Sequence, residues 1–189
     1  MVSFNTNELR NGLKVLCEGN PMIILEYDFI NPGKGQAFNR VKLRNLKNGR
    51  ILKKTFKIGE RIKAANILDI KANYSYFDGN YHIFMDNETF EQYIVSTTIL
   101  RDTKKWIKPQ DNCLLTLFNS QVIAVVAPNL VELQVADTDP GFKGDTAGTV
   151  SKMATLETGA VIRIPLFVQP GETIKINTRT NEYISRAKG

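Results

Sequence analysis

Short segments in which hydrophobic and polar residues alternate occupy most of the chain, and turn-forming residues separate them at short intervals. Alternation with a period of two sends successive side chains to opposite faces of a strand. Apolar residues at helical spacing are scarce. The pattern therefore predicts an all-β chain of small barrels or sandwiches, with one short helical turn within residues 86–93.

The first third begins with two apolar segments, residues 13–17 and 22–30. The turn sequence Glu18-Gly-Asn-Pro21 separates them, so we expect them to pair as a hairpin. A third segment, residues 37–46, continues into the tight turn Asn48-Gly49 and a further strand. These segments fit a small barrel of five or six strands, as the strands of the other two thirds do.

The segment at residues 37–46 alternates cations with aliphatic residues. Its cations are Arg40, Lys42 and Arg44, and Val41 and Leu43 lie between them. Because alternate residues share one face of a strand, we predict a basic outer face above a hydrophobic core.

The later thirds repeat the hairpin pattern. Asp78-Gly79-Asn80 joins two aromatic segments, and residues 119–121 join two aliphatic ones. The last third has predicted strands at residues 131–135, 160–164, 173–176 and 183–186, with a long loop at 137–149. Loops of that length are usually functional or disordered. We predict three barrel domains, at residues 1–64, 65–128 and 129–189.

The chain has 189 residues and a formal net charge of +6. The charge is unevenly distributed, because residues 1–64 contain 13 Lys and Arg against 5 Asp and Glu, a formal charge of +8. Ordinary solvated surfaces mix both signs. The asymmetry favours a segment that binds a polyanion over a merely soluble face.

Several classes of protein are disfavoured. No apolar run approaches the roughly 20 residues of a membrane helix, and the N-terminus lacks a signal-peptide pattern, so we expect a cytoplasmic protein that does not contact membranes. Cys17 and Cys113 lie far apart without partner histidines, which argues against a disulfide framework and against a metal site.

The most specific local sequence is Asn31-Pro-Gly-Lys-Gly35 between two predicted strands. Pro32 suits the first central position of a type II turn, and Gly33 is expected to take the positive φ of the second. Lys34, flanked by Gly33 and Gly35, is then presented at a hairpin tip. On spacing alone an ordinary exposed lysine is the simpler interpretation. A nucleotide-binding P-loop is excluded, because Gly35 and a strand follow the lysine.

Two separated regions resemble bacterial elongation factor P. One is Asn31-Pro-Gly-Lys-Gly-Gln-Ala-Phe38 with Arg40-Val-Lys-Leu-Arg44 after it. The other is Lys152 to Gly171, which contains Glu-Thr-Gly and Pro-Leu-Phe and has Ile164 where the family usually has valine. Gly144-Asp-Thr-Ala-Gly148 also resembles a loop of that family.

The resemblance implies an L-shaped tRNA mimic, with an N-terminal SH3/KOW-like barrel followed by two OB-fold barrels. Such a factor is expected to be monomeric and to bind the 70S ribosome, through rRNA and ribosomal proteins, between the peptidyl and exit tRNA sites. It would stimulate peptide bond formation and relieve stalling at consecutive prolines by acting on the P-site peptidyl-tRNA. The lysine-tipped subclass implies a β-lysyl extension on Lys34, with possible hydroxylation, added by a lysyl-tRNA-synthetase-like ligase.

The resemblance also implies RNA contacts, with a solvated face or a structural turn as the alternatives. The candidate residues are Arg40, Lys42, Arg44, Gly144, Asp145, Thr146, Gly148, Tyr183 and Arg186.

We predict no independent catalysis and no bound cofactor. The single histidine, His82, lies in an aromatic segment without a catalytic partner pattern, and Trp106 is expected in the core. Two alternative functions are an elongation-factor-P-like paralogue and a general OB-fold RNA-binding protein.

Overall fold

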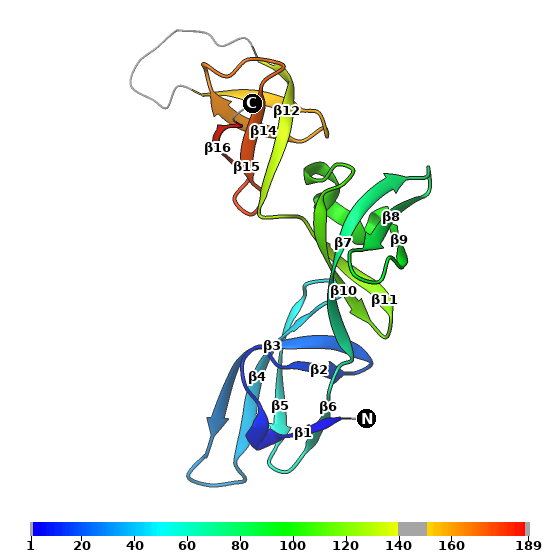
Figure 1. Cartoon of the computed structure of the whole chain (residues 1–189). Coiled ribbons are helices and arrows are strands. Elements are labelled where there is room, and N and C mark those ends of the chain that lie inside the picture. Colours follow the sequence, from blue (N-terminus) through cyan, green and yellow to red (C-terminus); the bar gives the residue numbers. More distant parts are fainter. Residues whose placement is uncertain (1, 140–150, 188–189) are drawn as a thin grey trace, which may run out of the picture. The chain divides into compact units, whose positions relative to one another are not determined.

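The structure is a computed structural model that describes residues 2–139 and 151–187, and it consists mainly of strands (Figure 1). The all-β prediction is confirmed. Internal contacts divide the chain into two compact units, Met1–Ile70 with Leu115–Ala124, and Lys71–Leu114 with Val125–Gly189. The predicted division into three domains remains a prediction.

The first sheet has four antiparallel strands in the order β2-β3-β4-β5. A separate pair, β1 with β6, adjoins the 3-10 helix η1 at Thr6–Glu8. The strand bounds are β1 Ser3–Asn5, β2 Lys14–Cys17, β3 Asn20–Ile30, β4 Phe38–Asn45, β5 Ile51–Lys57 and β6 Arg61–Lys63.

The expected hairpins of this sheet are present. Strands β2 and β3 pair in antiparallel register from Lys14 opposite Ile23 to Cys17 opposite Asn20. Gly49, in the predicted turn between β4 and β5, has a φ of 73°, a conformation that glycine adopts at little steric cost. The core below the sheet includes Val15, Ile24, Val41 and Leu43, each at most 1% exposed.

The second sheet has the order β11-β10-β7-β8-β9. Its strands are β7 Ile67–Phe77, β8 Tyr81–Asp86, β9 Gln92–Ser96, β10 Asn112–Phe118 and β11 Gln121–Val126. The Asp78 carboxylate accepts hydrogen bonds from the backbone amides of Asn80 and Tyr81, which fixes the turn of the β7–β8 hairpin. These two bonds also lower the pKa of Asp78.

The short helical turn expected within residues 86–93 is present as a single turn that does not continue into a helix. The Phe90 amide donates a hydrogen bond to the Asp86 carbonyl at 3.2 Å, the spacing of one helical turn, and the Asp86 carboxylate accepts hydrogen bonds from the amides of Glu88 and Thr89. The helical residues lie further on, in α1 Thr97–Leu100 and the 3-10 helix η2 Arg101–Trp106. They escaped prediction because so short an element shows no helical periodicity.

The third sheet has the order β14-β13-β12-β15-β16. Its strands are β12 Leu130–Thr138, β13 Ser151–Leu156, β14 Val161–Pro165, β15 Thr173–Asn177 and β16 Glu182–Arg186. Its core includes Leu133, Ile174 and Ile176, each fully buried, and Trp106 from η2 belongs to the same cluster. The prediction that Trp106 is a core residue is confirmed.

His82 is a buried side chain of the second sheet, only 1% exposed. Its Nδ1 lies 3.1 Å from the Tyr74 hydroxyl, and its ring centroid lies 4.5 Å from that of Phe77. Burial lowers the pKa of His82, nearby Lys104 lowers it further, and Asp78 opposes the shift. The fold therefore disfavours the protonated form of this imidazole.

The lowered pKa of His82 predicts a pH-dependent stability. Below the ordinary value of 6.5 the unfolded chain takes up a proton that the folded chain resists, so the free energy of unfolding should fall as pH drops through that value. We expect His82→Gln to flatten this slope between about pH 7 and about pH 5. Urea unfolding followed by circular dichroism measures it, and equal slopes for both proteins would contradict the assignment.

Candidate functional site

The candidate site is the loop that joins β3 to β4, at the far end of their hairpin (Figure 1). The last cross-strand pair before the loop is Ile30 with Phe38, and residues 31–37 lie outside both strands. Lys34 is exposed and makes no hydrogen bond or ion pair with any residue that the structure describes. The hairpin thus presents a free primary amine on a flexible stem.

The backbone on both sides of Lys34 is uncrowded. A Cβ added to Gly33 would meet no atom within 4 Å, and one added to Gly35 would meet only the Pro32 ring, at 3.9 Å. The exposed Lys34 side chain therefore extends from a loop whose flanking positions carry no bulky neighbour.

The turn prediction was wrong at Gly33. That residue does not adopt a positive φ; Gly35 does, with a φ of 111°. The left-handed residue therefore follows the lysine instead of preceding it. A side chain at Gly35 would be strained whatever the space around it, so glycine is required there by the backbone.

The predicted alternation in β4 is confirmed. Val41 and Leu43 are buried, whereas Arg40 and Arg44 are exposed on the opposite face. In the register with β5, Lys42 lies opposite Lys53, so both strands contribute to one basic face. Arg40, Arg44 and Lys53 make no ion pair with the described residues, which leaves them available to phosphate groups.

The basic face is partly neutralised by β3, which the sequence analysis did not foresee. Lys42 Nζ lies 2.8 Å from Glu26 Oε1, and Asp28 lies opposite Arg40 in the register. On the other side of β5, Lys54 donates a hydrogen bond to Glu18, which raises the pKa of Lys54, with Cys17 contributing to the same shift. Residues 1–64 therefore have fewer cations without an ion pair than their 13 Lys and Arg residues suggested.

The pair between Lys42 and Glu26 predicts an effect on RNA affinity. Replacing Glu26 by glutamine should release Lys42 and raise affinity for a short single-stranded RNA by up to about fivefold, the equivalent of an exposed ion pair. Filter binding at two salt concentrations measures this, and the salt dependence should steepen. In a Lys42→Ala background the substitution should have less effect; an equal gain there would contradict a role for the pair.

The remaining candidate RNA-contact residues lie in the last third of the chain. Gly144, Asp145, Thr146 and Gly148 lie outside the described residues. Tyr183 is partly buried against the core of the third sheet. The side chain of Arg186 lies over the Phe167 ring, 4.7 Å from its centroid, and donates a hydrogen bond to the Phe167 carbonyl.

Arg186 is also paired with Glu172, at 3.4 Å. Tyr183 and Arg186 both make contacts within their own sheet. Their predicted RNA contacts remain predictions.

Two aromatic residues near the loop were missed from sequence. Tyr27 and Phe29 lie on the face of β3 opposite to Glu26 and Asp28, and they are 43% and 59% exposed. The alternation Glu-Tyr-Asp-Phe was the available signal, because it places both rings on one face of the strand.

Within residues 2–139 and 151–187, no group of three or more His, Cys, Asp or Glu side chains is arranged to hold a metal ion. The helices of that part of the chain are also too short or too polar to cross a membrane.

Comparison with protein families gives three matches along the chain. The elongation factor P KOW-like domain matches residues 5–62, the elongation factor P OB domain matches residues 67–125, and the C-terminal domain of elongation factor P matches residues 131–186. The KOW-like match contains the whole hairpin that carries Lys34.

Two solved structures have a similar fold. Eukaryotic translation initiation factor 5A from Methanococcus jannaschii is 19% identical with a TM-score of 0.54, over 66% of this chain and 94% of that one. A translation initiation factor eif-5a family protein from Naegleria fowleri ATCC 30863 is 14% identical with a TM-score of 0.54, over 66% of this chain and 97% of that one. At these identities the likeness concerns the fold.

Proposed function

The chain belongs to the elongation factor P family of translation elongation factors, and we propose that it relieves ribosomes stalled at consecutive prolines. It binds the 70S ribosome between the peptidyl and exit tRNA sites, contacting rRNA and ribosomal proteins. Lys34 then reaches the acceptor end of the peptidyl-tRNA. The observation that carries the proposal is the exposed Lys34 at the end of the β3–β4 hairpin, without a partner among the described residues.

The chemistry assigned to Lys34 is positioning. Proline reacts poorly because its ring constrains the secondary amine and the backbone dihedrals. A cation on a long stem stabilises a productive orientation of the peptidyl-tRNA, and correct orientation lowers reaction barriers substantially. The ribosome supplies the peptidyl transferase centre, so the factor needs no nucleophile or base of its own.

Lys34 is proposed to carry a β-lysyl extension, possibly hydroxylated. The open space around Gly33 and Gly35 is compatible with such a group, and a lysyl-tRNA-synthetase-like ligase would attach it. The factor is proposed to be a cytoplasmic monomer.

Mass spectrometry of protein from its native host tests the modification. Intact mass together with a tryptic map should show an added mass confined to the peptide that contains Lys34. A fully active native protein with an unmodified Lys34 would overturn the modification while leaving the ribosomal role to be tested separately.

A general RNA-binding protein is the competing function. It predicts tight, salt-sensitive binding to naked RNA that does not depend on Lys34. The paired Lys42 and Lys54 argue against it, because a general binder is expected to keep such cations free.

A further inference from the structure

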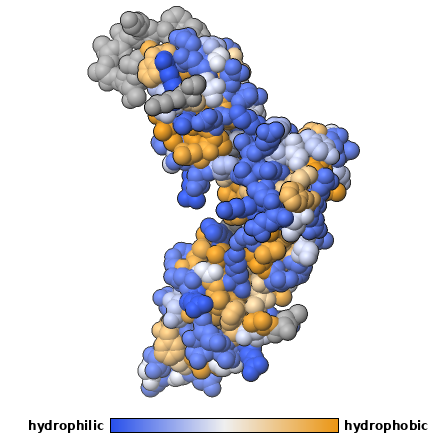
Figure 2. Space-filling model, viewed as in Figure 1, coloured by the Kyte–Doolittle hydropathy of each residue, from blue (hydrophilic) through white to orange (hydrophobic). Residues whose placement is uncertain are grey.

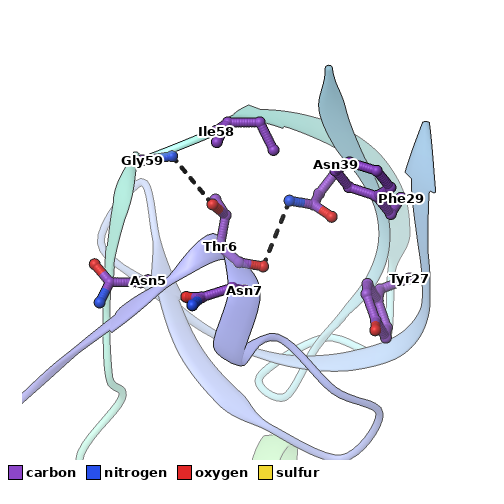
Figure 3. Close-up of a pocket in the computed structure, with 8 residues that line it drawn as sticks. All are labelled: Asn5, Thr6, Asn7, Tyr27, Phe29, Asn39, Ile58 and Gly59. Atoms are coloured by element: carbon purple, nitrogen blue, oxygen red, sulfur yellow. Dashed lines mark hydrogen bonds between the residues drawn. The ribbon is translucent and has the colours of Figure 1, made fainter. Parts of the chain in front are cut away.

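A cavity of about 520 Å³ lies beside the β3–β4 hairpin (Figure 3). The register of the two strands places its lining residues Tyr27, Phe29 and Asn39 on the face opposite to Arg40 and Lys42. Tyr27 and Phe29 line it from β3, Asn39 from β4, Thr6 from η1, and Ile58 and Gly59 from the segment after β5. Its volume lies within the usual range for small-ligand sites, about 300–1,000 Å³. We call it the aromatic pocket.

Hydrogen bonds hold two polar side chains of the aromatic pocket in place, those of Asn39 and Thr6. Asn39 is 2% exposed and donates a hydrogen bond from Nδ2 to the Thr6 carbonyl at 3.4 Å. The Thr6 hydroxyl accepts a hydrogen bond from the Gly59 amide at 3.2 Å. Both bonds are drawn in Figure 3, and neither uses the carboxamide oxygen of Asn39. A buried amide thus retains an acceptor at the pocket wall.

The apolar part of the pocket consists of the exposed rings of Tyr27 and Phe29 and the exposed side chain of Ile58. Hydrophobic residues reach the surface among hydrophilic ones on the face shown in Figure 2. In this pocket Phe29 is 59% exposed and lies directly opposite Asn39 in the strand register. Aromatic rings on a sheet surface beside hydrogen-bonding edges are how single-stranded RNA bases are commonly held.

The charges around the pocket decide what part of a ligand it holds. None of the described residues that line it is charged. Charges of both signs are adjacent to lining residues: Glu8 accepts a hydrogen bond from the amide of the lining residue Asn5, Glu60 follows the lining residue Gly59 and accepts one from the Lys57 amide, and Lys57 and Arg61 are close in sequence to Gly59. Mixed signs at the rim do not select a phosphate. The lining suits an uncharged, flat group with polar edges.

We propose that the aromatic pocket binds one unpaired nucleobase of an RNA partner. The base stacks on Phe29 and Tyr27, and the Asn39 carboxamide faces its edge. RNA is favoured over a peptide because the opposite face of β4 and β5 carries Arg40, Arg44 and Lys53, which would hold phosphates further along the same RNA. The proposal extends the proposed function, and it is tested without ribosomes.

Nuclear magnetic resonance of the full chain with free adenosine, AMP and ribose 5-phosphate tests it. Adenosine and AMP should move the ring resonances of Tyr27 and Phe29 to a similar extent, and ribose 5-phosphate should not. Phe29→Ala should weaken nucleoside binding about tenfold or more, whereas Phe29→Tyr should retain it. The matched control is Phe90→Ala, since Phe90 is 72% exposed and lies outside the pocket.

Three results would overturn the proposal. The rings could remain unmoved by adenosine up to its solubility limit. Ribose 5-phosphate could act as strongly as AMP, which would indicate a phosphate site. An acetylated triproline peptide could move the same rings while adenosine does not, which would indicate a peptide site.

Discussion

Replacing Lys34 by alanine is expected to abolish relief of proline stalling while leaving ribosome binding within about twofold of the unsubstituted protein. The side chain is exposed and makes no hydrogen bond or ion pair with the described residues, so its removal should leave the stability of the fold nearly unchanged. The exposed cations of β4 and β5 remain and supply phosphate contacts. The substitution should therefore remove the stimulation of peptide bond formation without weakening ribosome binding, because the lysine acts on the orientation of the reactants.

In vitro translation of a triproline reporter measures stimulation, and co-sedimentation with ribosomes measures binding. Lys53→Ala is the matched control, since Lys53 is an exposed lysine of the same sheet without an ion pair. It should weaken binding modestly and still relieve stalling once the factor is saturating. Lys34→Arg keeps a positive charge but cannot accept a lysyl group, so it should lose most of the stimulation if the extension is required.

Replacing Trp106 by alanine is expected to cause the largest loss of stability of any single change considered, about 3–5 kcal/mol. Trp106 is 5% exposed and belongs to the cluster that includes Leu133, Leu156 and Ile176. Truncation removes a large buried surface and leaves a cavity that the surrounding strands can fill only in part. The Trp106→Phe protein retains most of the apolar volume, so its free energy of unfolding should fall by less.

Urea unfolding followed by circular dichroism measures this effect, because the alanine variant lacks the chain's single tryptophan. Phe90→Ala is the control, since it removes an exposed aromatic residue and should change stability by no more than about 0.5 kcal/mol. A Trp106→Ala protein as stable as this control would mean that the cluster does not depend on the indole.

The strands and turns could be predicted because their signals are local. The alternation of Arg40, Val41, Lys42 and Leu43 determines which side chains face the core, and Asp78-Gly79 specifies a hairpin turn. The exposed lysine at the hairpin end followed from the same kind of evidence. Such signals need only neighbouring residues.

The features that escaped prediction depend on residues distant in sequence. The Lys42–Glu26 pair arises from the register between β3 and β4, which the alternation alone does not set. Trp106 joins the third sheet from a helix that precedes it in the chain. The positive φ at Gly35 shows a different limit, because the local turn rule that follows from Pro32 pointed to Gly33 and the loop does not obey it.

The most direct test of the central claim is the rate of Pro–Pro peptide bond formation on purified ribosomes, measured by rapid quench at saturating factor. We predict that native protein accelerates this step strongly, that the Lys34→Ala protein bound to the same ribosomes does not, and that a bond between two non-proline residues is little affected by either. Equal acceleration of Pro–Pro bond formation by the native and Lys34→Ala proteins would contradict the account.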